Sequence, residues 1–143
     1  MADILGTHEY QMDPKGRISL PADLRDAFED GVFLTLGQEG CLYAYPRDEW
    51  ERKKAELREY DSSDPNSRAY IRMFTAHAAV ADLDSQGRLV IPRKLRERTG
   101  LHKEVAVVGA LTHAEIWAGD AWERYEATHG SSYAAGSLAP GKS

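Results

Sequence analysis

The sequence predicts an α+β fold, mainly β, in which one small unit occurs twice along the chain. Residues 13–25 align with residues 84–96, where Asp, Gly, Arg, Pro, Leu and Arg recur at six of 13 positions. A second match pairs residues 48–52 with residues 120–124. Short segments that alternate polar and apolar residues predict strands. A unit of about 50 residues rarely buries enough apolar surface alone, so we expect the copies to interlock with each other or with other subunits.

The first copy, residues 5–58, starts as a β-hairpin. Polar and apolar residues alternate at 7–12, which predicts a strand with one solvent-exposed face. In the following turn, Asp13 suits the first position of a type I turn and Gly16 the last, so both are predicted to support it. A second strand follows at 17–20. A further strand pair is predicted at 32–36 and 41–45.

The second copy, residues 77–129, repeats this order. Asp84 and Gly87 take the equivalent turn positions and are likewise predicted to support the turn. The predicted strands of this copy lie at 88–91, 105–108 and 114–117.

Helices flank the strands in both copies. A proline that suits the first helical position and a glycine that suits the helix end bracket short helices at 21–31 and 92–100. Each copy then ends in a longer helix whose first residues have the spacing of a capping box. The predicted boxes are Asp48 with Glu51 and Asp120 with Glu123.

Two segments lie outside the copies. In the connecting segment, residues 59–76, Asp64 followed by Pro65 is a strong helix start and precedes an apolar stripe, which predicts a helix. Residues 130–143 are small and polar without periodicity, which predicts a disordered tail.

Composition limits the classes of function. The chain has 143 residues, 42% hydrophobic and 29% charged, which are values of a globular protein. Its 18 basic and 23 acidic residues give a net charge of −5, which argues against indiscriminate coating of nucleic acid but allows a local basic face. The single cysteine, Cys41, excludes an internal disulfide. No apolar stretch approaches the roughly 20 residues of a membrane helix, and the acidic N-terminus is unlike a signal peptide. We therefore expect a soluble, cytoplasmic protein with no membrane contact.

An arginine directly after each turn glycine is a feature that the turn itself does not require. Arg17 and Arg88 would project from a fixed rim, which suits phosphate contact or bidentate pairing with guanine. An ion pair with the aspartate of the same turn is an equally good interpretation. Residues 84–98 add local positive charge, with five basic and two acidic side chains. The predicted DNA-binding residues are Lys15, Arg17 and Arg88, with Arg93 and Lys94 as further candidate contacts.

No residue pattern predicts catalysis or a metal site. The five histidines are scattered, and none lies four residues from another. The chain has no glycine-rich phosphate loop, nucleophile elbow or His-Glu-x-x-His motif. We therefore expect no enzymatic activity, and no catalytic residue, cofactor, metal or small-molecule substrate.

Three features together resemble a known family. They are the opening Leu5-Gly6-Thr7-His8, the two Asp-x-x-Gly-Arg-hydrophobic-x-hydrophobic-Pro blocks, and the stretch from Gly109 to Glu115-Ile116-Trp117. Over about residues 4–129 the chain resembles the MraZ family, which belongs to the AbrB-like (SpoVT-AbrB) swapped-hairpin transcription factors. The resemblance implies two tandem swapped-hairpin halves that intertwine as a double-split β-barrel. It further implies a ring-shaped homo-oligomer that binds direct repeats in double-stranded DNA, usually as a repressor of its own division and cell-wall gene cluster.

The resemblance also assigns roles to residues of this chain. The Asp-x-x-x-Arg element of the family falls on Asp13 and Arg17 in the first copy, and on the equivalent Asp84 and Arg88 in the second. Lys15 takes the basic turn position, where the second copy has Gln86 instead. We therefore expect the first copy to contribute more to DNA binding. The resemblance further implies a cytoplasmic, nucleoid-associated protein.

Two other classes of function compete with DNA binding. Swapped-hairpin folds also occur in antitoxins, so a protein-binding module is the main alternative. Two complete copies in one chain disfavour the usual antitoxin plan of one copy followed by a toxin-binding tail. A small enzyme is the weakest alternative, because no polar constellation offers a nucleophile, a base or a metal.

Overall fold

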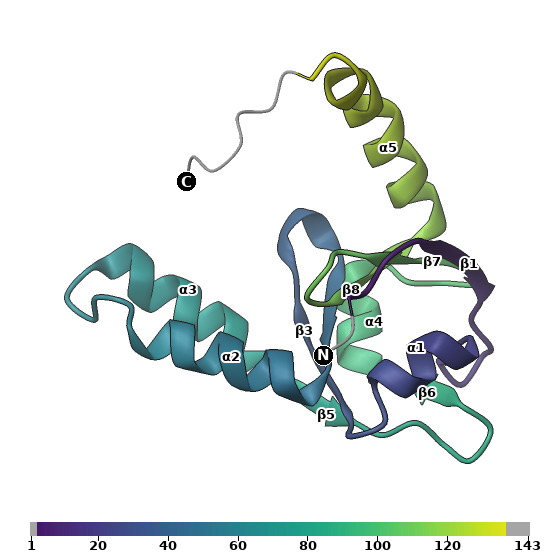
Figure 1. Cartoon of the computed structure of the whole chain (residues 1–143), viewed down its shortest axis with the longest axis horizontal. Coiled ribbons are helices and arrows are strands. Elements are labelled where there is room, and N and C mark those ends of the chain that lie inside the picture. The colour runs from purple at the N-terminus through teal and green to yellow at the C-terminus, as the bar shows by residue number, and fades with distance from the viewer. Residues whose placement is uncertain (1–2, 137–143) are drawn as a thin grey trace.

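Strands from the two copies are interleaved within one antiparallel sheet (Figure 1). A computed structural model describes residues 3–136 of the chain. The six strands pair in the order β1-β7-β8-β4-β3-β5, and exchanging each strand for its counterpart in the other copy gives the same order reversed. The bounds are β1 (Thr7–Gln11), β3 (Val32–Leu36), β4 (Leu42–Tyr45), β5 (Ala79–Ala81), β7 (Glu104–Gly109) and β8 (Ala114–Ala118).

The first strand of each copy crosses to the other copy. β1 pairs with β7, and its counterpart β5 pairs with β3. In the middle of the sheet, β4 pairs with β8. The two copies therefore interlock with each other within a single chain, as their small size predicts.

A separate two-stranded ribbon joins the copies a second time. Here β2 (Arg17–Ser19) pairs antiparallel with β6 (Arg88–Val90), and Ile18 stands opposite its own counterpart Leu89. Both of these side chains are 1% exposed, so one face of the ribbon belongs to the core. Backbone hydrogen bonds from Leu20 to Gly87 and from Ile91 to Gly16 extend the pairing beyond the strands.

The main core lies between this ribbon and the large sheet, and both copies build it. Besides Ile18 and Leu89, it contains Leu34 and Ile116, each at most 1% exposed. Because neither copy forms a complete core by itself, the apolar burial that stabilises one copy depends on the presence of the other.

Five α-helices surround the strands within the described residues. They are α1 (Ala22–Ala27), α2 (Arg47–Arg58), α3 (Pro65–Ala76), α4 (Arg93–Thr99) and α5 (Gly119–Ala134), with a 3₁₀ turn at Gln38–Gly40. Figure 1 shows α2 and α3 together extending from one side of the sheet and α5 from another. Asp64 caps α3 as predicted, because its carboxylate accepts the Asn66 backbone N–H at 3.2 Å. None of these helices is long and apolar enough to cross a membrane.

The predicted capping boxes are wrong. α2 begins at Arg47 after Pro46, and α5 begins at Gly119 after Ala118, and neither start has a side-chain cap. Asp48 and Asp120 instead lie inside the first turn, where each carboxylate accepts the backbone N–H of the next residue. Acidic groups there still interact favourably with the helix dipole.

The structure also corrects the prediction of a tail that is disordered from residue 130. Helix α5 continues to Ala134, so residues 130–134 are helical. Within this helix the rings of Tyr125 and His129, one turn apart, pack with their centroids 4.1 Å apart. Residues 137–143 of the predicted tail lie outside the described residues.

Candidate nucleic-acid interface

Each hairpin turn is held by an aspartate that binds the backbone around it. The Asp13 carboxylate accepts the backbone N–H groups of Lys15 and Arg17, both at 2.9 Å, and its carbonyl accepts that of Gly16 at 2.9 Å. Asp84 makes the same three contacts in the second copy. Gly16 and Gly87 have φ values of 80° and 74°, a left-handed conformation that disfavours residues with a side chain. The two turns are therefore the same rigid structure built twice.

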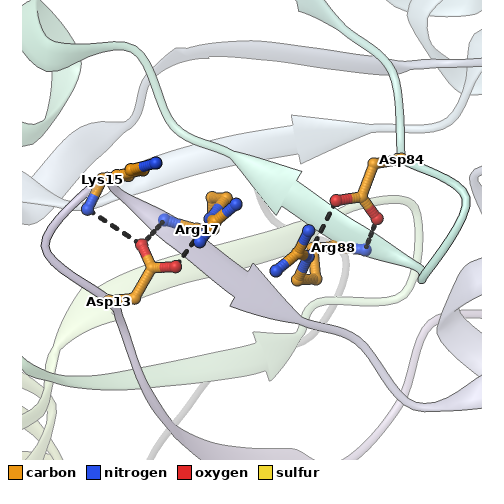
Figure 2. A network of polar contacts seen from close by, with 5 residues as sticks. All are labelled: Asp13, Lys15, Arg17, Asp84 and Arg88. Atoms are coloured by element: carbon orange, nitrogen blue, oxygen red, sulfur yellow. Dashed lines mark hydrogen bonds and ion pairs between the residues drawn. The ribbon is translucent and has the colours of Figure 1, made fainter.

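The arginine of each turn forms an ion pair with the turn aspartate. Arg17 Nε lies 2.6 Å from Asp13 Oδ2, and Arg88 Nε lies 2.8 Å from Asp84 Oδ2 (Figure 2). The sequence alone allowed this intramolecular ion pair as an equally good alternative to DNA contact. The ion pair engages the Nε donor, one of five N–H donors of a guanidinium. The two arginine side chains stay 29% and 28% exposed, so they are oriented but not covered.

The same contacts lower the pKa of both aspartates. The hydrogen bond from the Arg17 backbone N–H is the largest influence that holds the pKa of Asp13 below its ordinary value. The Arg17 side chain and the Lys15 backbone act in the same direction, and partial desolvation opposes them. Asp84 is affected in the same way by Arg88 and Gln86. Both carboxylates are thus charged partners that keep the arginines aligned near neutral pH.

The ribbon carries both arginines on its outer face. In the β2–β6 register, Arg17 stands opposite Val90 and Ser19 opposite Arg88, while the alternating residues between them point into the core. Figure 2 shows the two arginines on neighbouring antiparallel strands. Diagonal neighbours of this kind are separated by about 7–8 Å. An antiparallel two-stranded ribbon fits the major groove of B-DNA, which is about 12 Å wide.

Two further arginines take part in this arrangement, and sequence reasoning missed their role. A side chain at Gly16 would collide with the guanidinium of Arg96 from α4, and one at Gly87 with that of Arg25 from α1. Arg25 Nε is also held at 2.6 Å from the Leu20 carbonyl. Arg25 and Arg96 occupy equivalent positions of the repeat, and this recurrence was the signal in the sequence. A surface helix alone does not require an arginine at that position.

The other candidate contacts, Arg93 and Lys94, lie exposed on α4. Arg93 forms an exposed pair with Glu97 at 3.2 Å. The contact of Arg96 with Gly16 brings α4 beside the first turn, and Arg93 lines the same cleft as Asp13 and Pro14 of that turn.

Among residues 3–136, the side chains do not form a metal-binding cluster or expose a cysteine. No group of three or more His, Cys, Asp or Glu side chains in this range is placed to hold a metal ion. Cys41 is 1% exposed, and burial raises the pKa of its thiol above the ordinary value, which disfavours the reactive thiolate.

Comparison with known proteins identifies the family. A family model described as "MraZ protein, putative antitoxin-like" matches the chain twice, at residues 4–73 and 73–137, which confirms the duplication. A transcriptional regulator MraZ of Pelotomaculum thermopropionicum is 40% identical over 129 residues, covering 90% of this chain and 89% of the relative. One of Paenarthrobacter aurescens is 48% identical over 121 residues, covering 85% of each. One of Corynebacterium urealyticum is 40% identical over 131 residues, covering 92% of each.

These relatives are named as regulators and not as enzymes, which confirms the prediction of a non-enzymatic protein. The double family match and the identities over nearly the whole chain lead to one conclusion: the chain belongs to the MraZ family.

Proposed function

We propose that the chain is a transcriptional regulator that binds double-stranded DNA through the β2–β6 ribbon. The observation that carries this proposal is the outer face of the ribbon, where Arg17 and Arg88 are oriented by ion pairs and remain partly exposed. The ribbon has the width of a major-groove reader. The names of the relatives support the same function.

Binding is sequence-specific in this proposal. A guanidinium held by its Nε can present its remaining donors to guanine O6 and N7, which is the commonest specific contact in the major groove. The aspartates then act as positioning residues, because they fix the arginines before DNA arrives and reduce the entropy lost on binding. Lys15, Arg93 and Lys94 contact the phosphate backbone, which orients the ribbon but carries no sequence information.

Tight binding requires several subunits. A single chain offers few cations toward DNA and has a net charge of −5, so phosphate contacts alone give it a low affinity. We infer that the chain forms a ring-shaped homo-oligomer, so that several ribbons engage direct repeats together and gain affinity through avidity. The crossing of β1 and β5 supports the further inference that each copy is a swapped-hairpin half of a double-split β-barrel.

The family resemblance supports a proposal for the biological role. We propose a repressor that acts on its own division and cell-wall gene cluster, in the cytoplasm and associated with the nucleoid. A bound oligomer over direct repeats upstream of the gene would block access to the promoter.

A fluorescence-anisotropy titration with duplex DNA from directly upstream of the protein's own gene tests this function. At physiological salt, native protein should bind this DNA much more tightly than a scrambled duplex. Arg17→Ala should weaken specific binding by about tenfold to a hundredfold, the range of one lost bidentate contact. Arg88→Ala should cost less, because Gln86 stands where the first turn has Lys15.

The matched control is Arg58→Ala, which removes one exposed cation from α2, away from the ribbon. It should bind as native protein does. Equal binding of native protein to both duplexes would overturn the DNA-binding function, and an equal or larger loss for Arg88→Ala would overturn the predicted order of the two copies.

A protein-binding role is the second candidate, because the matching family is described as antitoxin-like. In that case the ribbon arginines would face an acidic protein surface instead of DNA. The same titration separates the two roles, since an antitoxin module without DNA function shows no preference for the upstream duplex.

A further inference from the structure

Because the two copies cross, the short helix of each copy lies beside the hairpin turn of the other copy. Arg96 of α4, in the second copy, packs on Gly16 of the first turn, and Arg25 of α1, in the first copy, packs on Gly87 of the second turn. Each rim of the ribbon is therefore composite. We define the first rim as residues 13–17 with residues 93–103, and the second rim as residues 84–88 with the equivalent residues 22–31.

The two rims have opposite charge although their backbones are equivalent. In the first rim, the helix segment 93–103 has five cationic side chains and one carboxylate, a net charge of +4. In the second rim, the segment 22–31 has one cation and four carboxylates, a net charge of −3. Nearly all of these side chains are exposed, so a molecule that binds from solution encounters this charge difference directly. The cations of segment 93–103 are Arg93, Lys94, Arg96, Arg98 and Lys103. The acids of segment 22–31 are Asp23, Asp26, Glu29 and Asp30.

A cleft in the first rim gathers part of this positive charge. It has a volume of about 990 Å³ and lies between the first turn and α4, with Arg93, Arg96 and Lys103 in its lining. Its two carboxylates, Asp13 and Glu97, are already paired with Arg17 and Arg93. The cleft thus presents more positive than negative charge beside Arg17, which pairs with Asp13 of its lining.

The surroundings of α1 are acidic instead. A cleft of about 530 Å³ beside this helix has one cation among its charged lining residues. They are Asp26, Glu29, Asp30, Asp48, Glu51 and Arg47. A DNA phosphate placed against α1 would meet like charge, whereas the same phosphate against α4 would meet opposite charge.

We propose that the first rim alone seats the DNA backbone, with a phosphate in the cleft between the first turn and α4, while the second rim contributes Arg88 and no phosphate contact. This proposal rests on the proposed DNA-binding function. The two ends of the DNA interface of one chain then differ, although the fold that carries them has nearly two-fold symmetry.

The seat is tested by the double variant Arg93→Ala/Lys94→Ala in the anisotropy titration with the upstream duplex at several salt concentrations. Both side chains are exposed, so thermal unfolding should stay close to that of native protein. Specific binding should fall at least tenfold. The slope of log K against log salt should become less steep by about 1 if Arg93, which lines the cleft, loses the seated phosphate, and by about 2 if Lys94, next to it on α4, also loses one, since each phosphate contact contributes about 0.9. The charge-matched control is Arg58→Ala/Arg124→Ala on α2 and α5, which should stay within threefold of native affinity.

The asymmetry is tested by placing a carboxylate at equivalent positions of α4 and α1. Arg93→Glu should weaken binding more than tenfold, whereas Ala22→Glu should change affinity less than threefold because no phosphate lies against α1. Equal losses for these two variants would overturn the asymmetry, and native-like affinity of Arg93→Ala/Lys94→Ala would overturn the phosphate seat. In both cases a large loss for Arg17→Ala would leave the DNA-binding function standing, whereas absence of specific binding by native protein would remove that function itself.

Discussion

Asp13 and Asp84 connect the folding of each turn to the orientation of its arginine. One carboxylate oxygen accepts two backbone N–H groups, and the other binds the arginine Nε. The same residue therefore stabilises the turn and prepares the group that we propose to contact DNA. The recurring Asp and Arg predicted that these residues belong together, but the sequence alone could not decide between an ion pair and a DNA contact. The geometry makes the two compatible, because the ion pair uses Nε and leaves the arginine partly exposed.

The lowered pKa of both aspartates predicts a loss of stability in acid. A carboxylate whose pKa is lower in the folded protein contributes stability that is complete above its ordinary pKa and disappears as the pH falls through the lowered value. The free energy of unfolding, measured by urea denaturation, should therefore decrease as the pH falls below about 4. In Asp13→Asn/Asp84→Asn this decrease should be shallower. An unchanged pH dependence would show that the two turns are not responsible.

Burial of Cys41 predicts an inert thiol. Its sulfur is 1% exposed and donates to the Gln38 carbonyl at 3.3 Å, and burial raises its pKa. A thiol-specific reagent at pH 8 should therefore react with native protein very slowly, and with one equivalent of thiol after denaturation. Absorbance of the released chromophore measures both rates, and rapid labelling of folded protein would contradict the burial of this side chain.

At the scale of elements, local patterns predicted which segments form strands but not which strands pair. The strand at 32–36 was predicted with the bounds that the structure has, because its apolar run ends at glycine on both sides. β5 was missed, since Ala-Val-Ala is short and carries no alternation. The capping boxes failed because each helix begins one residue before the predicted cap, α2 at Arg47 and α5 at Gly119, so Asp48 and Asp120 are already helical. Pairing between copies depends on burial across the whole molecule, and no window of sequence contains that information.

Close packing between the turns and the helices of the opposite copy predicts the effect of Gly16→Ala. The substitution strains the left-handed backbone and forces the guanidinium of Arg96 to move off the turn, so it should reduce the free energy of unfolding by about 1 kcal/mol. The matched control is Gly40→Ala, because Gly40 also has a positive φ, of 83°, but has open space around it. Chemical denaturation should show a larger loss for Gly16→Ala, and equal losses would mean that the Arg96 contact is not restrictive.

At the scale of the whole molecule, the duplication produces one interlocked structure rather than two separate domains. The sheet, the ribbon and the main core each combine strands of both copies. Composition alone indicated one acidic globular chain, and its net charge of −5 hid the difference between the rims. That difference arises only after the copies cross, because the basic helix of the second copy comes to lie beside the turn of the first.

Interlocking predicts that both copies unfold together. In Trp117→Phe/Trp122→Phe the remaining Trp50 reports on the first copy, and in Trp50→Phe the other two tryptophans report on the second. Within each variant, the denaturation midpoint from tryptophan fluorescence should coincide with that from far-UV circular dichroism. Two separate transitions would show that the copies are independent domains.

The central claim is that DNA lies on the outer face of the β2–β6 ribbon, and affinity cleavage tests it directly. An iron chelate that cleaves nearby DNA is attached to Ser19→Cys on the outer face, or to Ala127→Cys on α5 as the comparison; both positions are exposed, and the buried Cys41 leaves native protein as the unlabelled control. With the duplex from upstream of the gene, Ser19→Cys should cleave within the bound repeats, and Ala127→Cys should cleave little. Cleavage from Ala127→Cys without cleavage from Ser19→Cys, at matched occupancy of the DNA, would contradict the assignment of the ribbon as the DNA-binding surface.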